Sequence, residues 1–546
     1  MAVEILSRQA SPVDGLLTLL KSSRSAVRIS TLLQIGKIDP SRAAQFQLDL
    51  QVVEMLRDSD SGVQAQALLT LSKQGERGAR HCHQIVRKLS HPVKDVQLAA
   101  LQALGDLGPL AASTSTDVLG VLQGNQDPAL VAAAALAIGK MKVSSAADKV
   151  AAKLDGPYSE VVKAACAGLS SMDRRVDAIG QVLLSHRDTS VKASAAAALL
   201  GMTKAEDFLP ELTKLLGDPD AALRYSVART MRHLAASLAA QKAALGALLK
   251  GDPDVAAAAA YVLGALGSQA ADQAPALEAL LNSKVEDTSA LALSATGAIS
   301  PLPAALRKPT VAAAETLGLA GVVTAAPRIM ELLKSSDSEV RAAAAEALGR
   351  LRDESAVPAL LLGLKDPSPS VVLACCGALG ASKPSPETSA AVAELLEDPH
   401  PAVRARAANA LAEMGDTQAF VEPIAALLDD KAPPVQVAAL RALVSCGEQG
   451  QLHAADVCRL AAQGDDRTRV VALQTLSQLG ERGAAFATEL EPLLDDALPE
   501  ICLAARRTLE QFKTGRAVPS LPSLPKVQEV PALEPPSAGA DFIAVV

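Results

Sequence analysis

Hydrophobic and polar residues follow one another along this chain with the spacing of short amphipathic helices. Residues 338–351 read SEVRAAAAEALGRL, a segment in which apolar side chains recur every three or four positions. Residues at that spacing share one face of an α-helix, so the segment is predicted to be a helix with one buried side. The residues on its apolar stripe are Val340, Ala344, Ala347, Leu348 and Leu351.

The same helical pattern repeats along the chain. Further copies occur at residues 93–108, 253–267, 401–415, 434–447 and 467–480. Stripes close at residues 383, 415, 447 and 480, so these copies follow one another at 32, 32 and 33 residues. Several copies come after another helical segment that ends in a Leu pair and an Asp-rich turn, as in LPELTKLLGDPD at 209–220. One repeat is therefore predicted to be a helix, a tight turn and a second helix.

Two short helices cannot bury their apolar stripes alone, but stacked repeats can. The chain is therefore predicted to be all-α, an α-solenoid superhelix of about sixteen two-helix repeats that occupies residues 1–513. The composition agrees, because only 2% of the residues are aromatic although 49% are hydrophobic. The abundant Ala and Leu are strong helix formers.

These repeats resemble the HEAT repeats, in particular their short PBS-lyase HEAT-like form. The resemblance rests on the Leu pair, the Asp turn, the Val-Arg dipeptide and the Ala-Leu-Gly ending, and it extends over roughly residues 12–513. It implies scaffold or adaptor activity, since only a minority of HEAT proteins are enzymes. It also implies ladders between neighbouring repeats, formed by turn aspartates and by the cation after Val. Matching positions are Asp218, Asp252, Asp337, Asp366 and Asp398, with Arg28, Lys163, Lys192, Arg224, Arg341 and Arg404.

The repeat pattern breaks near residue 301. The step from about 301 to 321 leaves no room for two full helices, and Pro301 and Pro303 interrupt the preceding helix. We predict a degenerate repeat at 301–321 that separates an N-terminal arm (1–300) from a C-terminal arm (322–513). If it is a hinge, the curvature of the chain varies at this point; the alternative is a deletion in one loop without mechanical effect.

The last 33 residues, 514–546, form a proline-rich tail. Its prolines are Pro519, Pro522, Pro525, Pro531, Pro535 and Pro536. Such a segment is predicted to be extended or disordered. It ends in an apolar group that suits docking into a partner's groove or onto the solenoid, with disorder without function as the alternative. The candidate partner-binding residues are Phe542, Ile543, Val545 and Val546.

A basic cluster occupies residues 77–94. Its candidate partner-binding residues are Arg77, Arg80, His81, His83, Arg87, Lys88 and Lys94. On a helix, residues 80, 83 and 87 share a face, which could receive an acidic segment or a phosphate group. The alternative is a solvated outer helix. A metal site is disfavoured, because His81 and His83 are two positions apart and point to opposite sides of a helix.

Charge and cysteine usage narrow the class of partner and the compartment. The formal net charge is −8, and nucleic-acid binders usually carry a basic surface, so no nucleic acid is expected. The seven cysteines form no Cys-x-x-Cys pair, which favours buried free thiols in a reducing intracellular compartment, the cytoplasm. The longest apolar stretch, 255–267, is shorter than the roughly 20 residues of a membrane span.

Motifs for catalysis are missing from the sequence. There is no phosphate-binding loop and no His-Glu-x-x-His zinc motif, and no histidine is followed by glutamate, as in the HEAT-like hydroxylases that bind iron. No cofactor, metal or catalytic residue is therefore expected. The leading hypothesis is a non-enzymatic scaffold that binds partner proteins within a larger assembly. The alternative, by analogy with the PBS-lyase name, is a bilin-lyase-like or chaperone-like factor that binds a pigment or its acceptor protein.

Overall fold

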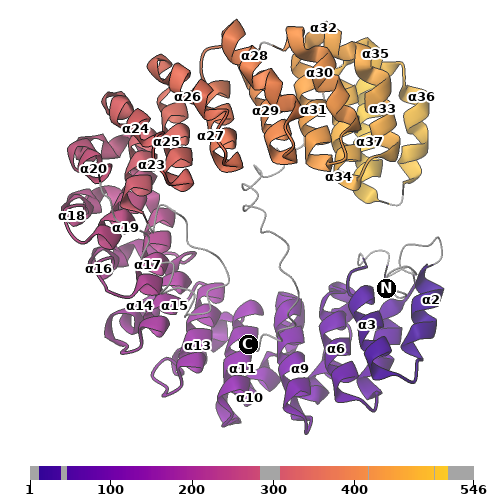
Figure 1. Cartoon of the computed structure of the whole chain (residues 1–546). Helices are drawn as coiled ribbons and strands as arrows, with labels where there is room; N and C mark the ends of the chain where they lie inside the picture. Colours follow the sequence, from indigo (N-terminus) through magenta and orange to yellow (C-terminus); the bar gives the residue numbers. More distant parts are fainter. Residues whose placement is uncertain are drawn as a thin grey trace. The chain divides into compact units, whose positions relative to one another are not determined.

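The chain folds into stacked pairs of helices (Figure 1). This computed structural model describes residues 12–38, 43, 46–282, 308–415, 417–496 and 498–514. All regular elements in these ranges are helices, which confirms the predicted all-α class. No helix among them is both long and apolar enough to cross a bilayer. The chain divides into two compact units, residues 1–347 and 348–546, which we treat separately.

The described residues of unit 1 form ten helix pairs, each with a first and a second helix. In order they are α2 (Pro12–Leu20) with α3 (Ser25–Ile35), α5 (Leu48–Glu54) with α6 (Ser61–Ser72), α8 (Cys82–Val86) with α9 (Lys94–Leu107), α10 (Ser115–Gly124) with α11 (Pro128–Lys140), α12 (Ala147–Ala151) with α13 (Ser159–Met172), α14 (Val176–Ser185) with α15 (Thr189–Leu199), α16 (Leu209–Leu215) with α17 (Ala221–His233), α18 (Lys242–Leu248) with α19 (Pro253–Leu263), α20 (Ala274–Leu280) with α23 (Pro309–Ala320), and α24 (Ala326–Leu332) with α25 (Ser338–Leu351), whose last turn belongs to unit 2. A short helix, α7 (Glu76–Ala79), follows α6.

Unit 2 continues the same alternation. Its pairs are α26 (Val357–Gly363) with α27 (Pro369–Gly380), α28 (Pro386–Glu394) with α29 (Pro401–Met414), α30 (Val421–Ala426) with α31 (Pro433–Ser445), α33 (Ala454–Gln463) with α34 (Asp466–Gln478), and α36 (Ala487–Leu490) with α37 (Pro499–Thr514). Two short helices, α32 (Gly447–Gly450) and α35 (Gly480–Ala484), lead into the following repeats.

Short 3-10 helices precede or extend many of the first helices. They are η1 (Met55–Arg57), η2 (Arg87–Ser90), η3 (Gly108–Thr114), η4 (Ser144–Ala146), η5 (Ala205–Phe208), η6 (Ala235–Gln241), η7 (Gly264–Gln273), η8 (Val323–Ala325), η9 (Glu354–Ala356), η10 (Leu395–Glu397), η11 (Gln418–Phe420), η12 (Leu427–Asp429), η13 (Gln451–His453) and η14 (Glu491–Asp495). The first helix of a repeat is thus often divided, whereas the second is a continuous α-helix.

Polar residues at the turns start the second helices. Asp60, for example, accepts hydrogen bonds from the backbone N–H groups of Gly62 and Val63 at the start of α6, at 2.8 and 3.1 Å. These are N–H groups that an α-helix cannot satisfy within itself. Asp220 caps α17 in the same way. The turn residues therefore fix where each second helix begins.

Small residues allow neighbouring second helices to pack closely. A Cβ atom on Gly139 of α11 would lie 2.3 Å from the Cα atom of Gly168 in α13, closer than two carbon atoms can approach. The Ala-rich stripes of α19 and α23 bury side chains such as Ala258 and Ala313 almost completely. A core built from small aliphatic groups thus explains why so few aromatic residues are needed.

Part of the predicted degenerate repeat 301–321 lies in a regular helix. α23 packs against α19 and α20, as an ordinary second helix does. Residues 309–320 belong to this helix, and residues 301–307 lie outside the described residues. The hinge and the division into arms stay predictions.

Candidate functional site

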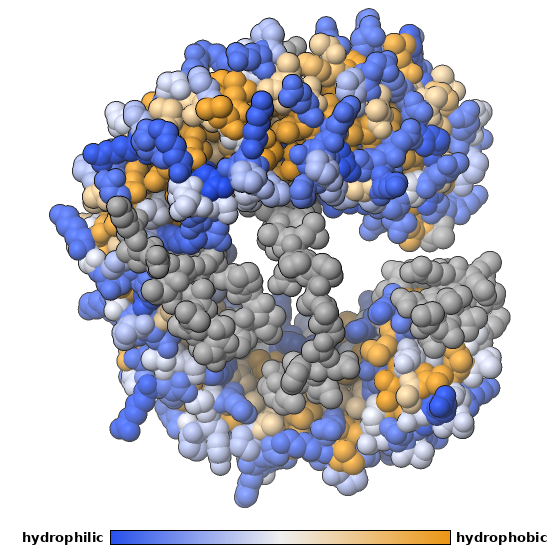
Figure 2. Space-filling model, in the orientation of Figure 1, coloured by the Kyte–Doolittle hydropathy of each residue, from blue (hydrophilic) through white to orange (hydrophobic). Residues whose placement is uncertain are grey.

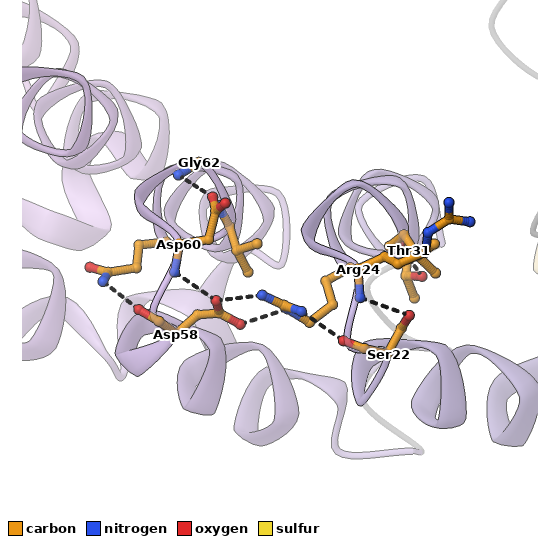
Figure 3. Close-up of polar contacts among 10 residues, drawn as sticks. Ser22, Arg24, Thr31, Asp58, Asp60 and Gly62 are labelled. Atoms are coloured by element: carbon orange, nitrogen blue, oxygen red, sulfur yellow. Dashed lines mark hydrogen bonds and ion pairs between the residues drawn. The ribbon is translucent and has the colours of Figure 1, made fainter.

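A network of polar contacts joins neighbouring repeats at their turns (Figure 3). The guanidinium of Arg28, in α3, donates from Nη2 to Asp58 Oδ1 at 2.8 Å and forms an ion pair with the same carboxylate, with Nε 2.7 Å from Oδ2. Its third nitrogen, Nη1, donates to the backbone carbonyl of Ser22 at 2.6 Å. One side chain therefore ties the turn of its own repeat to the turn of the next.

Each of these turn residues has two roles. The side chain of Asp58 accepts the backbone N–H of Asp60 at 2.9 Å, and its carbonyl accepts Gln64 Nε2 at 2.7 Å. In eight repeats of the described ranges, a side chain six positions after the turn residue donates to the carbonyl of that turn residue. These donor–acceptor pairs are Arg28–Ser22, Gln64–Asp58, Gln97–His91, Arg224–Asp218, Arg341–Ser335, Arg404–Asp398, Gln436–Asp430 and Cys502–Asp496. We call these contacts, together with the ion pairs to the next repeat, the turn ladder.

Ion pairs of the turn ladder recur in both units. The remaining pairs are Lys94–Asp127, Arg224–Asp254, Lys308–Asp337, Arg404–Asp430 and Arg469–Asp496. The family resemblance thus names the cations Arg28, Arg224 and Arg404 correctly, but Arg224 pairs with Asp254 rather than Asp252.

Asp337, also matched by the resemblance, pairs with Lys308, and several of the other matched aspartates contact their own turns. Asp218, Asp366 and Asp398 accept N–H groups within their own turns. Asp252 caps α19 by accepting from the backbone N–H of Asp254. Lys163 and Lys192 make no ion pair in the part of the chain that the structure describes.

Part of the basic cluster at 77–94 contributes to the contacts between repeats. Arg77 Nη1 lies 3.3 Å from Asp49 Oδ1, and His81 Nε2 lies 3.1 Å from Asp49 Oδ2. Asp49 is buried in α5. Burial alone would raise the pKa of the Asp49 carboxyl, but hydrogen bonds from His81 and Arg77 outweigh it and hold the pKa below its usual value. Arg77 and His81 therefore stabilise a buried carboxylate.

Two lysines of the cluster also contact residues of neighbouring repeats. Lys88 Nζ donates to Gln64 Oε1 at 2.7 Å, and partial burial lowers the pKa of Lys88. Lys94 pairs with Asp127 at 2.8 Å, and this contact lowers the pKa of Asp127. Both contacts cross from one repeat to a neighbour.

The other three residues of the cluster are exposed. Arg80 ends α7, His83 lies in α8 and Arg87 begins η2, so the segment is divided and not one continuous helix. None of the three makes a side-chain ion pair within the described ranges. The four tail residues named from the sequence, Phe542, Ile543, Val545 and Val546, lie outside those ranges.

Sequence analysis did not identify a row of surface residues on the second helices. The residue nine positions after the one that precedes the helix is exposed or half-buried in nine described second helices of unit 1 and five of unit 2. Those residues are Leu33, Leu69, Gln102, Leu136, Ala167, Ala197, Arg229, Tyr261 and Glu346, and then Gly377, Asn409, Arg441, Gln474 and Arg507. We call them the second-helix ridge. In α23 the equivalent residue, Leu317, is buried.

Because stacked repeats pack alike, equivalent positions of one unit face the same side of its stack. The ridge carries large apolar groups near the start of unit 1, where Leu33 is 41% and Leu136 is 37% exposed. It carries cations farther along, at Arg229 and at Arg441 of unit 2. The ridge could have been found in the sequence by counting nine positions from each capping residue. The periodicity of hydrophobic residues alone does not reveal it.

The thiols are free, and six of the seven are buried. Burial raises the pKa of Cys375 and of Cys376 to about 12, so both remain protonated near neutral pH. No group of three or more His, Cys, Asp or Glu side chains in the described ranges has the geometry to hold a metal ion. The adjacent Cys375 and Cys376 are thus inert parts of the core.

A comparison with protein families matches the HEAT repeats at residues 304–374 and 357–443. The chain contains HEAT repeats. The two matched segments together extend from before α23 to within α31. They include the ion pair of the turn ladder between Arg404 and Asp430. No curated protein sequence matches the chain.

Solved structures of HEAT-like solenoids share the fold. Yeast importin-beta (Kap95p) matches with a TM-score of 0.62 and 15% identity, over 94% of this chain and 78% of that one. A crystal structure of importin beta matches with a TM-score of 0.56 and 14% identity, over 92% and 78%. The complex of CpcE and CpcF of phycocyanin lyase from Nostoc sp. PCC7120 has a TM-score of 0.31 and 21% identity, over 50% of this chain and 94% of that one. At these identities the likeness to the two importin structures concerns the fold alone.

Proposed function

We propose that this HEAT-repeat chain is a scaffold that holds partner proteins along the second-helix ridge. The observation that carries the proposal is the ridge itself. It places exposed apolar and cationic side chains at one repeated position, on helices that the turn ladder fixes relative to their neighbours. Figure 2 shows hydrophobic patches among hydrophilic side chains on the face that it displays. Exposed apolar groups on an ordered surface are typical of protein-binding sites.

A second contact surface in this proposal is the exposed part of the basic cluster. Arg80, His83 and Arg87 have no ion pair among described residues, so an acidic partner segment would not have to displace an internal contact. Arg77, His81, Lys88 and Lys94 would support this surface indirectly, through the contacts to Asp49, Gln64 and Asp127.

The tail is the third element of the proposal. The apolar residues Phe542, Ile543, Val545 and Val546 would dock into a partner, with the proline-rich stretch before them as the tether. Seven free cysteines support a reducing intracellular compartment, and we propose the cytoplasm as the site of action.

Photo-crosslinking tests the ridge directly. A benzophenone amino acid replaces Leu136 on the ridge, or Leu184 on the first helix α14 as a matched control with 46% exposure. We expect full-length protein in extract of its own cells to form a discrete crosslinked product from position 136 and none from position 184. Equal crosslinking from both positions, or none from either, would contradict the ridge as the binding surface.

Capture experiments separate the other two surfaces. Partners retained by full-length protein are compared with those retained by residues 1–513 and by an Arg80→Ala, His83→Ala, Arg87→Ala variant. A matched control replaces Lys37, Lys250 and Lys365, three exposed lysines without an ion pair among described residues. Loss of a stoichiometric partner from one variant, but not from the control, assigns that surface. Full retention by every variant removes both surfaces from the proposal.

A further inference from the structure

Two tyrosine side chains lie on or next to the second-helix ridge, on neighbouring helices. The chain has three tyrosines and no tryptophan. Two of the tyrosines, Tyr225 and Tyr261, lie on neighbouring second helices, α17 and α19, which pack against each other. Both are half-buried, so part of each side chain is accessible.

Two arginines accompany these tyrosines. Tyr225, Arg229 and Arg232 are spaced four and three residues apart on α17, so they share one face of that helix. Arg229 and Tyr261 occupy equivalent ridge positions, nine residues after Asp220 and Asp252 (220 to 229 and 252 to 261). The Arg232 guanidinium lies 4.3 Å from the centre of the Tyr261 ring, and its Nη1 donates to the Tyr261 carbonyl at 3.2 Å. This contact holds the arginine and the ring together.

The positive charge of this face is only partly balanced. Residues 221–233 include three arginines and one histidine but no acidic residue. Arg224 is buried and already paired with Asp254, whereas Arg229 is exposed and has no ion pair in the ranges described. On the adjacent helix α15 and its C-cap, the positions equivalent to Tyr225, Arg229 and Arg232 hold the uncharged residues Ala193, Ala197 and Leu200. Burial raises the pKa of the Tyr261 hydroxyl, and the nearby Glu315 of α23 raises it further. The negative charge of Glu315 offsets part of the positive charge of the arginines.

We propose that Tyr225, Arg229, Arg232 and Tyr261 form a binding site for an acidic peptide segment of a partner protein. Guanidinium groups bind carboxylates through paired hydrogen bonds, and tyrosine rings cover the methylene groups of Glu side chains. Two rings and two cations spread over neighbouring helices fit an extended segment with several carboxylates. The inference rests on the proposed scaffold function and names the chemistry of one partner segment.

Tyrosine fluorescence reports directly on this site, because no tryptophan masks it. The test uses full-length protein carrying Tyr158→Phe, which removes the third tyrosine, on α13's N-terminal side and 53% exposed. A heptaglutamate peptide is the probe. We expect a saturable change in tyrosine emission, and we expect added salt to weaken the binding, since the attraction is between charges.

Two variants give the decisive comparison. Arg229→Glu is expected to weaken peptide binding about tenfold or more, because an attractive charge becomes a repulsive one. Arg467→Glu makes the same charge reversal at an exposed position of α34 in unit 2, outside the second-helix ridge, and is expected to leave the affinity unchanged. Far-UV circular dichroism confirms that both variants are folded, and Arg229→Gln provides a milder replacement that tests the same contact.

Any of four results overturns the proposal. The first two are no saturable change with the peptide and an equal loss of affinity in Arg467→Glu. The other two are an equal response to inorganic phosphate at matched ionic strength and stronger binding of a single-stranded oligonucleotide than of the peptide. Failure here leaves the crosslinking at position 136 unaffected, so it is distinguishable from failure of the scaffold function.

Discussion

Replacing Arg404 with alanine removes the best-connected ion pair of the turn ladder in unit 2. Arg404 Nε and Nη2 contact the two carboxylate oxygens of Asp430 at 2.7 and 2.9 Å, and Nη1 donates to the Asp398 carbonyl at 2.7 Å. The Arg404 and Asp430 side chains are only 18% and 9% exposed. Arg404 belongs to the α28–α29 repeat and Asp430 to the next one, so the substitution weakens the boundary between two repeats.

The expected loss in the free energy of unfolding follows from the contacts that the Asp430 carboxylate loses and keeps. A hydrogen bond to a charged group contributes about 1.5–3 kcal/mol, and breaking a fully buried pair costs about 3–5 kcal/mol. After the substitution, the Asp430 carboxylate keeps one contact, the backbone N–H of Ala432 at 2.8 Å. Because the pair is not fully buried, we expect the free energy of unfolding of this unit to fall by about 2–3 kcal/mol.

The loss depends on pH in a definite direction. Burial would raise the pKa of the Asp430 carboxyl, but the hydrogen bond from Arg404 outweighs it, and the pKa is lowered overall. A carboxyl with a lowered folded pKa stabilises the protein above its unfolded pKa of about 4, and this stabilisation disappears as the pH falls through the folded value. The difference between wild type and Arg404→Ala should therefore be full at pH 7 and shrink in acid.

Urea unfolding followed by circular dichroism measures this difference. The matched control is Lys383→Ala, which breaks an ion pair to Glu354 whose side chains are 84% and 63% exposed. Exposed pairs contribute little, so the control should unfold like wild type. A double-mutant cycle with Asp430→Asn isolates the coupling between the two side chains. The reasoning is refuted if Arg404→Ala is no less stable than the control, or if the coupling energy is zero.

Three further outcomes are expected from single positions. Gly139→Ala should lower stability by about 1–3 kcal/mol, because its Cβ would meet Gly168, whereas Gly120→Ala in an open position should raise it by about 0.5–1 kcal/mol; thermal unfolding distinguishes them. Asp49→Asn should flatten the loss of stability below about pH 4, seen in acid titrations, since the lowered pKa of the Asp49 carboxyl ties its stabilisation to ionisation. Cys376, whose pKa burial raises to about 12, should resist iodoacetamide at neutral pH in folded protein and react once it is unfolded, as mass spectrometry would show; equal labelling in both states would contradict it.

The periodic features of the fold could be predicted from the sequence because they depend on local pattern. The stripe at 338–351 matches α25, and the Asp-rich turn at 218–220 supplies the N-cap of α17. Spacing of apolar residues and capping residues both act over a few positions, so no knowledge of distant contacts is needed. The place of α23 was harder to predict, because the partners of this helix, α19 and α20, lie far before it in the sequence and the local pattern does not reveal them.

The candidate site could be predicted only in part, because its contacts cross between repeats. Arg77 and Arg80 look alike in a basic segment, yet Arg77 contacts Asp49, 28 residues earlier, and Arg80 is exposed. Gln64 and Gln97 take the position of the ladder arginines without any charge that would reveal it. Which cation is paired depends on the rotation of each helix within its stack, and that is set by packing against the neighbouring repeat.

The turn ladder and the second-helix ridge divide the work of the charged side chains. Arg224, a cation early in a second helix, lies within reach of its own turn and of the next repeat. It therefore forms contacts within the stack, to the Asp218 carbonyl and to Asp254. A cation five residues later on the same helix, Arg229, lies beyond that reach and stays exposed. The same division separates Arg404 from Arg441 in unit 2. Position within the repeat therefore limits which charges can reach the next repeat, but an acidic side chain within reach is also needed, because Lys192, at the same early position as Arg224, makes no ion pair in the described ranges.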